Sequence, residues 1–456
     1  MDSKNIKALL ACGLLSLAGI SQAQTLGEIY NSAVDNDPQI RAAGAALKSQ
    51  KSLTQQAQGA LLPKLDFTYS KSHTNFENKA SAGSPVTIIA SSYGLSLSQP
   101  LFNASTWFNY KQVKAIDHKA ELDFSASQQD LIIRVAVNYF NILRANDALI
   151  AAKTEEAAIK RQLEQTQQRF DVGLIAITDV HEAQAAFDLV QVGRIVAKNQ
   201  LDIAYEALQA ITGQQYTSIS TLKEDYPITN PMPADPQAWA DDALAGNFAL
   251  KSIETLVVSA RQGVKAKRAK HLPTVSLFGQ YQVDDNDDAS TIVFNNQAVP
   301  LSPTDQVSKT IGIKIKLPLY SGGMTMAASR QASYDLIQTQ ENLTMAQRSL
   351  VQQTRSLYSA VVADVQRIKA RQQAIVSTQS ALEATEVGYD VGTRNIVDVL
   401  QAQRGLYRSK RDYAAARYDY VIHKLQLKQA TGQLSPADMS AINGWIDSSS
   451  NTQRRN

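Results

Sequence analysis

The chain has little material for cofactor, metal or redox chemistry. It contains one cysteine and five histidines among 456 residues, and the histidines lie far apart without a metal-ligand spacing. No glycine-rich phosphate loop precedes a helical segment, since Gly322-Gly323 fits a strand-to-helix turn better. The sequence therefore predicts no enzyme activity, no metal site and no cofactor.

Charge of one sign and long apolar runs are also scarce. The formal net charge is only +3, which gives no reason to expect nucleic acid or a strongly charged partner. Beyond the N-terminus no stretch reaches 18 consecutive apolar residues, so no helix of the mature chain is expected to cross a membrane.

The first residues predict a secretory signal peptide at 1–23. Two lysines precede an apolar run at 8–20, and Ser21-Gln22-Ala23 fits a small-residue cleavage site. Lipidation at Cys12 is the weaker alternative, because the apolar run continues past the cysteine to this second site. Cleavage after Ala23 leaves a secreted chain without cysteine and with a net charge of +2.

The two halves of the mature chain repeat one another. Phe170-Asp171-Val172-Gly173 recurs 219 residues later as Tyr389-Asp390-Val391-Gly392, and Asp179-Val180 recurs at the same offset as Asp398-Val399. A constant offset indicates a tandem of two structural repeats, with a period too long for a solenoid. We divide the chain into repeat 1 (24–215), a linker or equatorial segment (216–238), repeat 2 (239–433) and a tail (434–456) that is partly equatorial or disordered.

Each repeat predicts a helix, two strands, a long helix, a turn and a further helix. Alternating apolar and polar residues predict β-hairpins at 64–101 and 274–319, with polar loops at 73–92 and 284–308. Two stretches of 68 residues without proline, 103–170 and 322–389, predict helices about 100 Å long. The second helices, 178–213 and 397–432, carry heptad patterns, and helices at about 25–60 and 239–270 precede the hairpins.

Four strands are too few to form a closed sheet. An unpaired edge in a bilayer costs several kcal/mol per polar group, and the smallest outer-membrane barrels have about eight strands. Two copies of the chain would supply eight strands, and three copies would supply twelve with room for a pore. A soluble hairpin packed on the helices is the alternative for the same alternation.

The two turns resemble those of the TolC family of outer-membrane efflux proteins. They read Val172-Gly173-Leu174-Ile175-Ala176-Ile177-Thr178-Asp179-Val180 and Val391-Gly392-Thr393-Arg394-Asn395-Ile396-Val397-Asp398-Val399-Leu400. The resemblance extends from about Leu26 to Leu434. It implies a mainly α fold with membrane β structure: a homotrimer whose twelve-stranded β-barrel in the outer membrane continues as a long periplasmic α-helical barrel.

The resemblance also implies a function and partners. The chain would be an outer-membrane exit duct of tripartite efflux systems, type I secretion systems or both, passively exporting drugs and proteins. Its partners would be a periplasmic adaptor (membrane fusion) protein, a proton-driven or ABC-type inner-membrane pump, and outer-membrane lipid, but no nucleic acid. A periplasmic coiled-coil scaffold or adhesin without a pore is the alternative, because heptad patterns alone do not indicate transport.

The resemblance implies a gate at the two turns. It assigns polar contacts that close the duct to Thr178, Asp179, Tyr389 and Arg394, and adaptor docking to Gly173, Leu174, Gly392 and Thr393. Asp398 and Gln401 would form the ring at the constriction. Gln401 stands where the family has a second acidic residue, which predicts weaker cation selectivity. Helix capping is the competing interpretation, with Asp179–Glu182 and Asp398–Gln401 as capping boxes.

Overall fold

The computed structural model describes residues 23–76, 86–286, 291–294, 297–300 and 306–452. The predicted signal peptide lies outside the described residues except for Ala23. The chain divides into two compact units, one formed by residues 1–44, 123–250 and 346–456, the other by 45–122 and 251–345. The units cut across the predicted repeats, because each unit contains segments from both halves of the chain. Below they are called unit 1 and unit 2.

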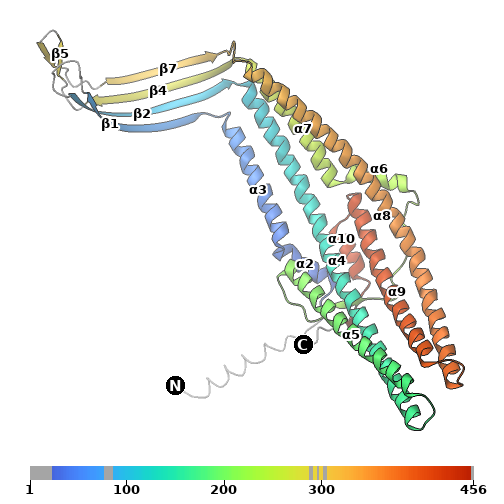
Figure 1. The fold of residues 1–456 in the computed structure, drawn as a ribbon. Helices are drawn as coiled ribbons and strands as arrows, with labels where there is room; N and C mark the ends of the chain where they lie inside the picture. Colours follow the sequence, from blue (N-terminus) through green and yellow to red (C-terminus); the bar gives the residue numbers. More distant parts are fainter. Residues whose placement is uncertain (1–22, 77–85, 287–290, 295–296, 301–305, 453–456) are drawn as a thin grey trace, which may run out of the picture. The chain divides into compact units, whose positions relative to one another are not determined.

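Unit 2 contains a four-stranded antiparallel sheet. Its strands are β1 (Lys64–Phe76), β2 (Val86–Phe102), β4 (Thr274–Asn286) and β7 (Gln306–Lys316), in the order β1-β2-β4-β7 (Figure 1). The strands extend into both predicted loops. The loop predicted at 284–308 also contains a small hairpin, β5 (Thr291–Phe294) and β6 (Gln297–Pro300).

The register of this sheet gives it one apolar face. Leu65 pairs with Leu97, Leu97 with Gly279, and Gly279 with Ile311, so these residues form one row across all four strands. Leu65 is 65% exposed and Ile311 is 80% exposed. Since neighbouring residues alternate between faces, serines, glutamines and lysines occupy the other face. The chain itself therefore leaves the apolar face uncovered.

The two longest helices are α4 (Ala104–Asp171) and α8 (Met324–Asp390), against predicted ranges of 103–170 and 322–389. Each is followed by a turn and a further long helix, α5 (Ile177–Thr212) after α4 and α9 (Ile396–Ala430) after α8. No helix in the described part of the chain combines the length and the apolar character that crossing a membrane requires.

The helix that precedes each hairpin is broken, contrary to the single helices predicted at 25–60 and 239–270. The first consists of α2 (Leu26–Asn36) and α3 (Pro38–Gly59), and the second of α6 (Pro236–Gly246), α7 (Phe248–Arg268) and the 3-10 turn η1 (Ala269–His271). Asp37 and Asn247 are extended, with ψ of 119° and 121°. Pro38 explains the first break, because proline lacks an N–H and disfavours a helical residue before it.

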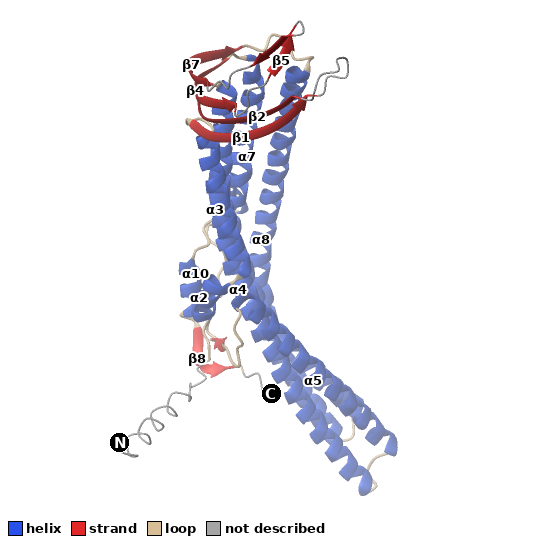
Figure 2. Ribbon diagram, turned by 90° about the vertical axis from the view of Figure 1, so that its left-hand side faces the viewer, coloured by secondary structure: helices blue, strands red, loops and turns tan. Residues whose placement is uncertain are grey.

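The core of unit 1 joins the helices to the chain's last described residues. Tyr139, Phe140 and Tyr420 are fully buried there. The linker strand β3 (Ser220–Leu222) pairs with β8 (Ile446–Asn451) of the tail. Figure 2 shows α10 (Pro436–Asn443) beside α2, where the Asn443 side chain accepts a hydrogen bond from the Gly27 amide at 3.0 Å. The tail therefore contributes α10 and β8 to unit 1.

Candidate functional site at the helical turns

The two turns lie at the ends of the α4–α5 and α8–α9 hairpins of unit 1 (Figure 1). Gly173 and Gly392 have φ of 77° and 79°, a left-handed conformation in which a side chain is strained. The amides that follow them bond back to the helix ends: Leu174 to the Arg169 carbonyl at 2.9 Å and Thr393 to the Gly388 carbonyl at 2.8 Å. The two turns therefore have the same backbone geometry, which explains why both repeats have glycine at this position.

Apolar side chains project from these turns into solvent. Val172, Leu174 and Val391 are 71%, 73% and 69% exposed. Thr393, which was predicted with Leu174 as a docking residue, instead donates from its hydroxyl to the Gly388 carbonyl at 3.0 Å. The turns thus present a small apolar surface on a backbone that is fixed by hydrogen bonds.

The second turn is closed by a capping box that starts earlier than predicted. Asn395 is the N-cap of α9; its side chain accepts from the Asp398 amide at 2.9 Å, and the Asp398 carboxylate accepts from the Asn395 amide at 3.4 Å. The predicted box Asp398–Gln401 is therefore wrong, because Asp398 occupies the third helical position. Gln401 lies one turn further along, with its side chain exposed.

The first turn lacks a side-chain cap. Helix α5 begins after Ala176, so Asp179 is the third helical residue and the predicted box Asp179–Glu182 is also wrong. The Thr178 hydroxyl donates to the Asp179 carboxylate at 3.4 Å. No cation pairs with this carboxylate in the described part of the chain. The positive end of the α5 dipole favours a carboxylate at this position.

Arg394 and Tyr389 have different surroundings. The Arg394 guanidinium lies 3.8 Å from the Asp398 carboxylate of the same turn. Its side chain passes over Gly388, where a Cβ would lie 2.9 Å from Arg394 Cγ. The Tyr389 hydroxyl is buried and has no hydrogen-bond partner among the described residues. Tyr389 also packs on two small apolar clusters, one of which joins α4 and α5 to α9.

The four predicted gate residues are not brought together within one chain. No hydrogen bond or ion pair joins Thr178 or Asp179 to Tyr389 or Arg394 among the described residues. The ends of the two hairpins are also joined by a polar contact that the sequence interpretation missed. Arg169, at the end of α4, donates to the Asp390 carboxylate, at the end of α8, at 2.6 Å. The Arg169 guanidinium also lies 4.8 Å from the centre of the Tyr389 ring.

The internal repeat contained a sequence signal that could have singled out Arg169 as a contact residue. At the offset of 219 residues, Arg169 corresponds to Gly388 and Asp390 corresponds to Asp171. The repeats thus differ in charge directly before their shared turn motif. Such a difference indicates a contact between the two turns and not a role common to both.

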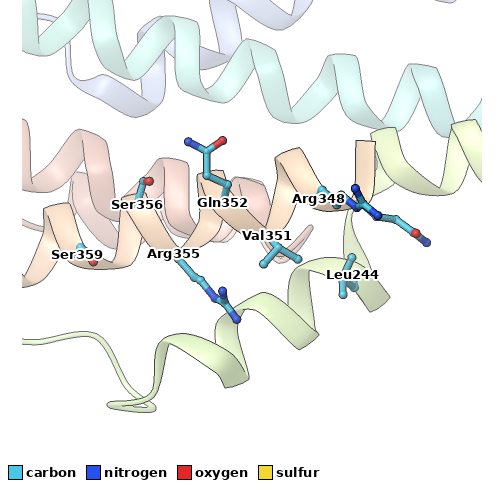
Figure 3. Close-up of a pocket in the computed structure, with 8 residues that line it drawn as sticks. Leu244, Arg348, Val351, Gln352, Arg355, Ser356 and Ser359 are labelled. Carbon is cyan, nitrogen blue, oxygen red and sulfur yellow. The ribbon is translucent and has the colours of Figure 1, made fainter. Parts of the chain in front are cut away.

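A separate groove of about 820 Å³ lies between α6 and α8 in unit 1 (Figure 3). Leu244 and Val351 supply apolar surface, and Arg355 donates to the Gln237 side chain on α6. The other lining residues are Gln347, Arg348, Gln352, Ser356 and Ser359. The lining contains no carboxylate, histidine or cysteine. Among the described residues no group of three metal-ligating side chains converges at any point.

The comparison with known families decides the identity. The family model for the outer membrane efflux protein matches residues 29–214 and again residues 239–433. The chain belongs to this family. The resemblance of the turns to the TolC family is thereby confirmed.

Individual outer membrane efflux proteins match almost end to end. The chain is 36% identical to the outer membrane protein TolC of Vibrio cholerae, over 97% of this chain and 98% of the relative. It is 28% identical to the alkaline protease secretion protein AprF of Pseudomonas aeruginosa, over 95% and 90%. The crystal structure of the Campylobacter jejuni CmeC outer membrane channel, 18% identical, has the same fold with a TM-score of 0.74, covering 93% of this chain and 90% of that one.

Membership of the outer membrane efflux family places the chain in the outer membrane of a Gram-negative cell envelope. The efflux family and the relatives, which include the outer membrane protein TolC and a protease secretion protein, indicate an exit duct of efflux and type I secretion. The mainly helical fold is shared with the solved channels.

Proposed function

We propose that three copies of the chain form one continuous exit duct across the outer membrane and into the periplasm. The observation that carries this proposal is the sheet of unit 2, which has an uncovered apolar face and two edge strands, β1 and β7, with no further partner among the described strands. A sheet in lipid must have no open edge. Pairing β1 of one copy with β7 of the next gives twelve strands from three copies, with the apolar face toward lipid and the polar face toward water.

The proposed gate closes by contacts between copies. Among the described residues the Asp179 carboxylate accepts a hydrogen bond from Thr178 but pairs with no cation, and the buried Tyr389 hydroxyl has no hydrogen-bond partner. Buried polar groups are nearly always hydrogen-bonded, so the Tyr389 hydroxyl requires a partner from outside the chain. We assign the closing contacts to Thr178, Asp179, Tyr389 and Arg394, and the constriction ring to Asp398 and Gln401.

The proposed partners are a periplasmic adaptor protein and an inner-membrane pump. The exposed apolar residues of the turns, with Gly173, Leu174, Gly392 and Thr393, form the docking surface for the adaptor. Energy for export comes from the pump, because the duct is a passive path. The proposed cargo includes both drugs and secreted proteins; the match to the outer membrane efflux family supports the first and the similarity to the alkaline protease secretion protein AprF supports the second.

Disulfide trapping tests the trimer directly. The only cysteine of the sequence is Cys12, in the predicted signal peptide, so the mature chain offers a cysteine-free background. Cysteines introduced in pairs, one along β1 from Lys64 to Ser70 and one along β7 from Ser308 to Lys314, should crosslink three copies in outer-membrane fractions. Pairs placed on β2 and β4, which already have neighbours on both sides, are the matched control. A protein that remains monomeric and leaves bilayers electrically silent would contradict the proposal.

Deletion of the gene tests the cargo. The deletion strain should become sensitive to drugs and should lose secretion of a type I substrate. Normal secretion with lost drug resistance would restrict the function to efflux, and the reverse result would restrict it to secretion.

A further inference from the structure

One segment of α9 carries only positive charge. Four of the thirteen residues at 399–411 are basic and none is acidic: Arg404, Arg408, Lys410 and Arg411. The equivalent segment of the first repeat, 180–192, has no lysine or arginine and contains Glu182 and Asp188. The positive charge is therefore a property of α9 and not of the repeat.

Three of these residues lie on the side of α9 that the chain leaves open. Val399, Leu406 and Ala416 are buried against neighbouring helices. Arg408 and Arg411 are exposed and Arg404 is partly exposed. A Cβ on Gly405 would meet no atom within 4 Å, so the surface beside Arg404 and Arg408 is open. Arg404, Arg408 and Arg411 are called the arginine strip below.

The strip continues the row that begins at the proposed constriction. Arg408 follows Gln401 by seven residues, or two helical turns, so the two residues share one side of the helix. Arg411 follows Arg404 by the same interval in the adjacent row. Gln401 itself is uncharged.

The positive charge of the strip is only partly compensated. Arg411 lies 3.9 Å from Asp412, whose carboxylate is also 3.1 Å from Arg371. Neither Arg404 nor Arg408 forms an ion pair with a described residue. Glu155 of α4 senses these charges: burial raises its pKa, and the charges of Arg404, Arg411 and Arg408 oppose this rise. Two carboxylates, Glu155 and Asp412, thus interact with three guanidinium groups.

We propose that the arginine strip makes the conduction path selective for anions beside the constriction, so that the duct favours cargo with carboxylate or phosphate groups. The inference rests on the proposed duct, in which Asp398 and Gln401 line the path. Three copies would place three strips around one axis, within reach of a passing ion, since charges act over about 10 Å at 0.1 M salt. A guanidinium binds carboxylate and phosphate oxygens through two parallel hydrogen bonds.

Reversal potentials test this inference. The full chain is reconstituted in planar bilayers across a tenfold KCl gradient, and the double variant Arg404→Gln, Arg408→Gln is compared with the natural sequence. The chloride-to-potassium permeability ratio should fall at least about twofold in the variant, because two of the three strip charges within a screening length of the path are lost. Tripolyphosphate should block the current of the natural protein at a lower concentration than that of the variant.

The control removes the same number of charges from other helices. Lys153→Gln with Lys198→Gln neutralises two exposed lysines on α4 and α5 and should leave the permeability ratio unchanged. An unchanged ratio in the arginine variant overturns the inference while the duct stands. Loss of the trimer in the arginine variant alone also overturns it, because the strip would then pair with acidic residues of a neighbouring copy. A natural protein that conducts no current overturns the duct itself and this inference with it.

Discussion

Arg169 and Asp390 join the ends of α4 and α8 through a hydrogen-bonded ion pair of 2.6 Å. The same guanidinium covers the ring of Tyr389, so one side chain contacts two consecutive residues of the opposite hairpin. Arg169 is 34% exposed and Asp390 is 65% exposed, which means that water screens the pair. Such a contact is weak enough to break when the hairpins move apart, yet it is directional while it lasts.

Arg169→Met should therefore weaken the contact between the hairpins without unfolding the protein. The expected loss of stability is below about 1 kcal/mol, because exposed ion pairs contribute little. The single-channel current should increase, since the turns are less restrained. Asp390→Asn should have the same effect on the current, and Arg169→Lys, which keeps the charge, should have a smaller one. Equal currents in all variants would show that the pair has no part in closure.

Arg394→Ser combined with Tyr389→Phe should enlarge the single-channel current in planar bilayers. The substitutions remove a guanidinium that reaches Asp398 and a buried hydroxyl that lacks a partner within the described chain. Tyr389→Phe alone should give part of the effect, because it removes a hydroxyl and keeps the ring under Arg169. A current identical to that of the natural protein would exclude these residues from the gate.

Asp37 should make the stability of unit 1 dependent on pH. Burial raises its pKa, but the hydrogen bond and charge of Arg134 and the amides of Gln39 and Ile40 outweigh burial, so its pKa lies below the usual range. A lowered folded-state pKa stabilises the protein above the unfolded pKa of about 4, and this stability is lost as the pH falls through the folded-state value.

Asp37→Asn should consequently lower stability by about 2 kcal/mol at pH 7, since a hydrogen bond to a charged group contributes about 1.5–3 kcal/mol. The difference from the natural protein should be smaller at pH 3 than at pH 7, because protonation of Asp37 removes the charged contact, as thermal melts in detergent would measure. Asp235→Asn is the matched control, because Asp235 also caps a helix, accepting from the Gln237 amide at 2.9 Å, and pairs with no cation among the described residues. If the Asp37→Asn variant and the natural protein differed in stability by the same amount at both pH values, the proposed role of the Asp37 charge would be contradicted.

Gly392→Ala should destabilise the second turn by about 1–2 kcal/mol, the cost of a left-handed residue with a Cβ. The φ of 79° at this position leaves no relaxed alternative for alanine. Limited proteolysis at the turn should become faster. Gly193→Ala serves as the control, because Gly193 lies within α5 and has open space around it. This substitution should increase the stability of the protein by about 0.5–1 kcal/mol.

The sequence predicted the elements that depend on local pattern. The strands follow from alternation, the long helices from the absence of proline, and the turns from Gly173 and Gly392. The first residue of α9 was harder to predict from the sequence, because Asn395–Asp398 and Asp398–Gln401 both fit a capping pattern. The structure selects the earlier pair. Which of two overlapping caps forms depends on where the preceding turn ends, and local composition does not encode that.

Contacts between distant segments were the least predictable part. Arg169 and Asp390 are separated by 221 residues, and only Asp390 belongs to the motif that both turns share, because Arg169 corresponds to Gly388 in the second repeat. The helix break before α3 is explained by Pro38, whereas no proline follows Asn247 at the break before α7. Its cause is specific: the Asn247 side chain caps the Leu250 amide at 2.9 Å and donates to the Ala430 carbonyl at 3.0 Å. Such a partner becomes visible only in three dimensions.

The pairing of β3 with β8 has a consequence for the order of folding. The Thr452 side chain is fully buried, where it bonds the Tyr205 hydroxyl at 2.7 Å and accepts from the Ile219 amide at 3.1 Å. Unit 1 therefore lacks part of its interior until residues 446–452 have been synthesised. Helices that are synthesised early therefore cannot reach their final packing in unit 1 before the last strand has been made.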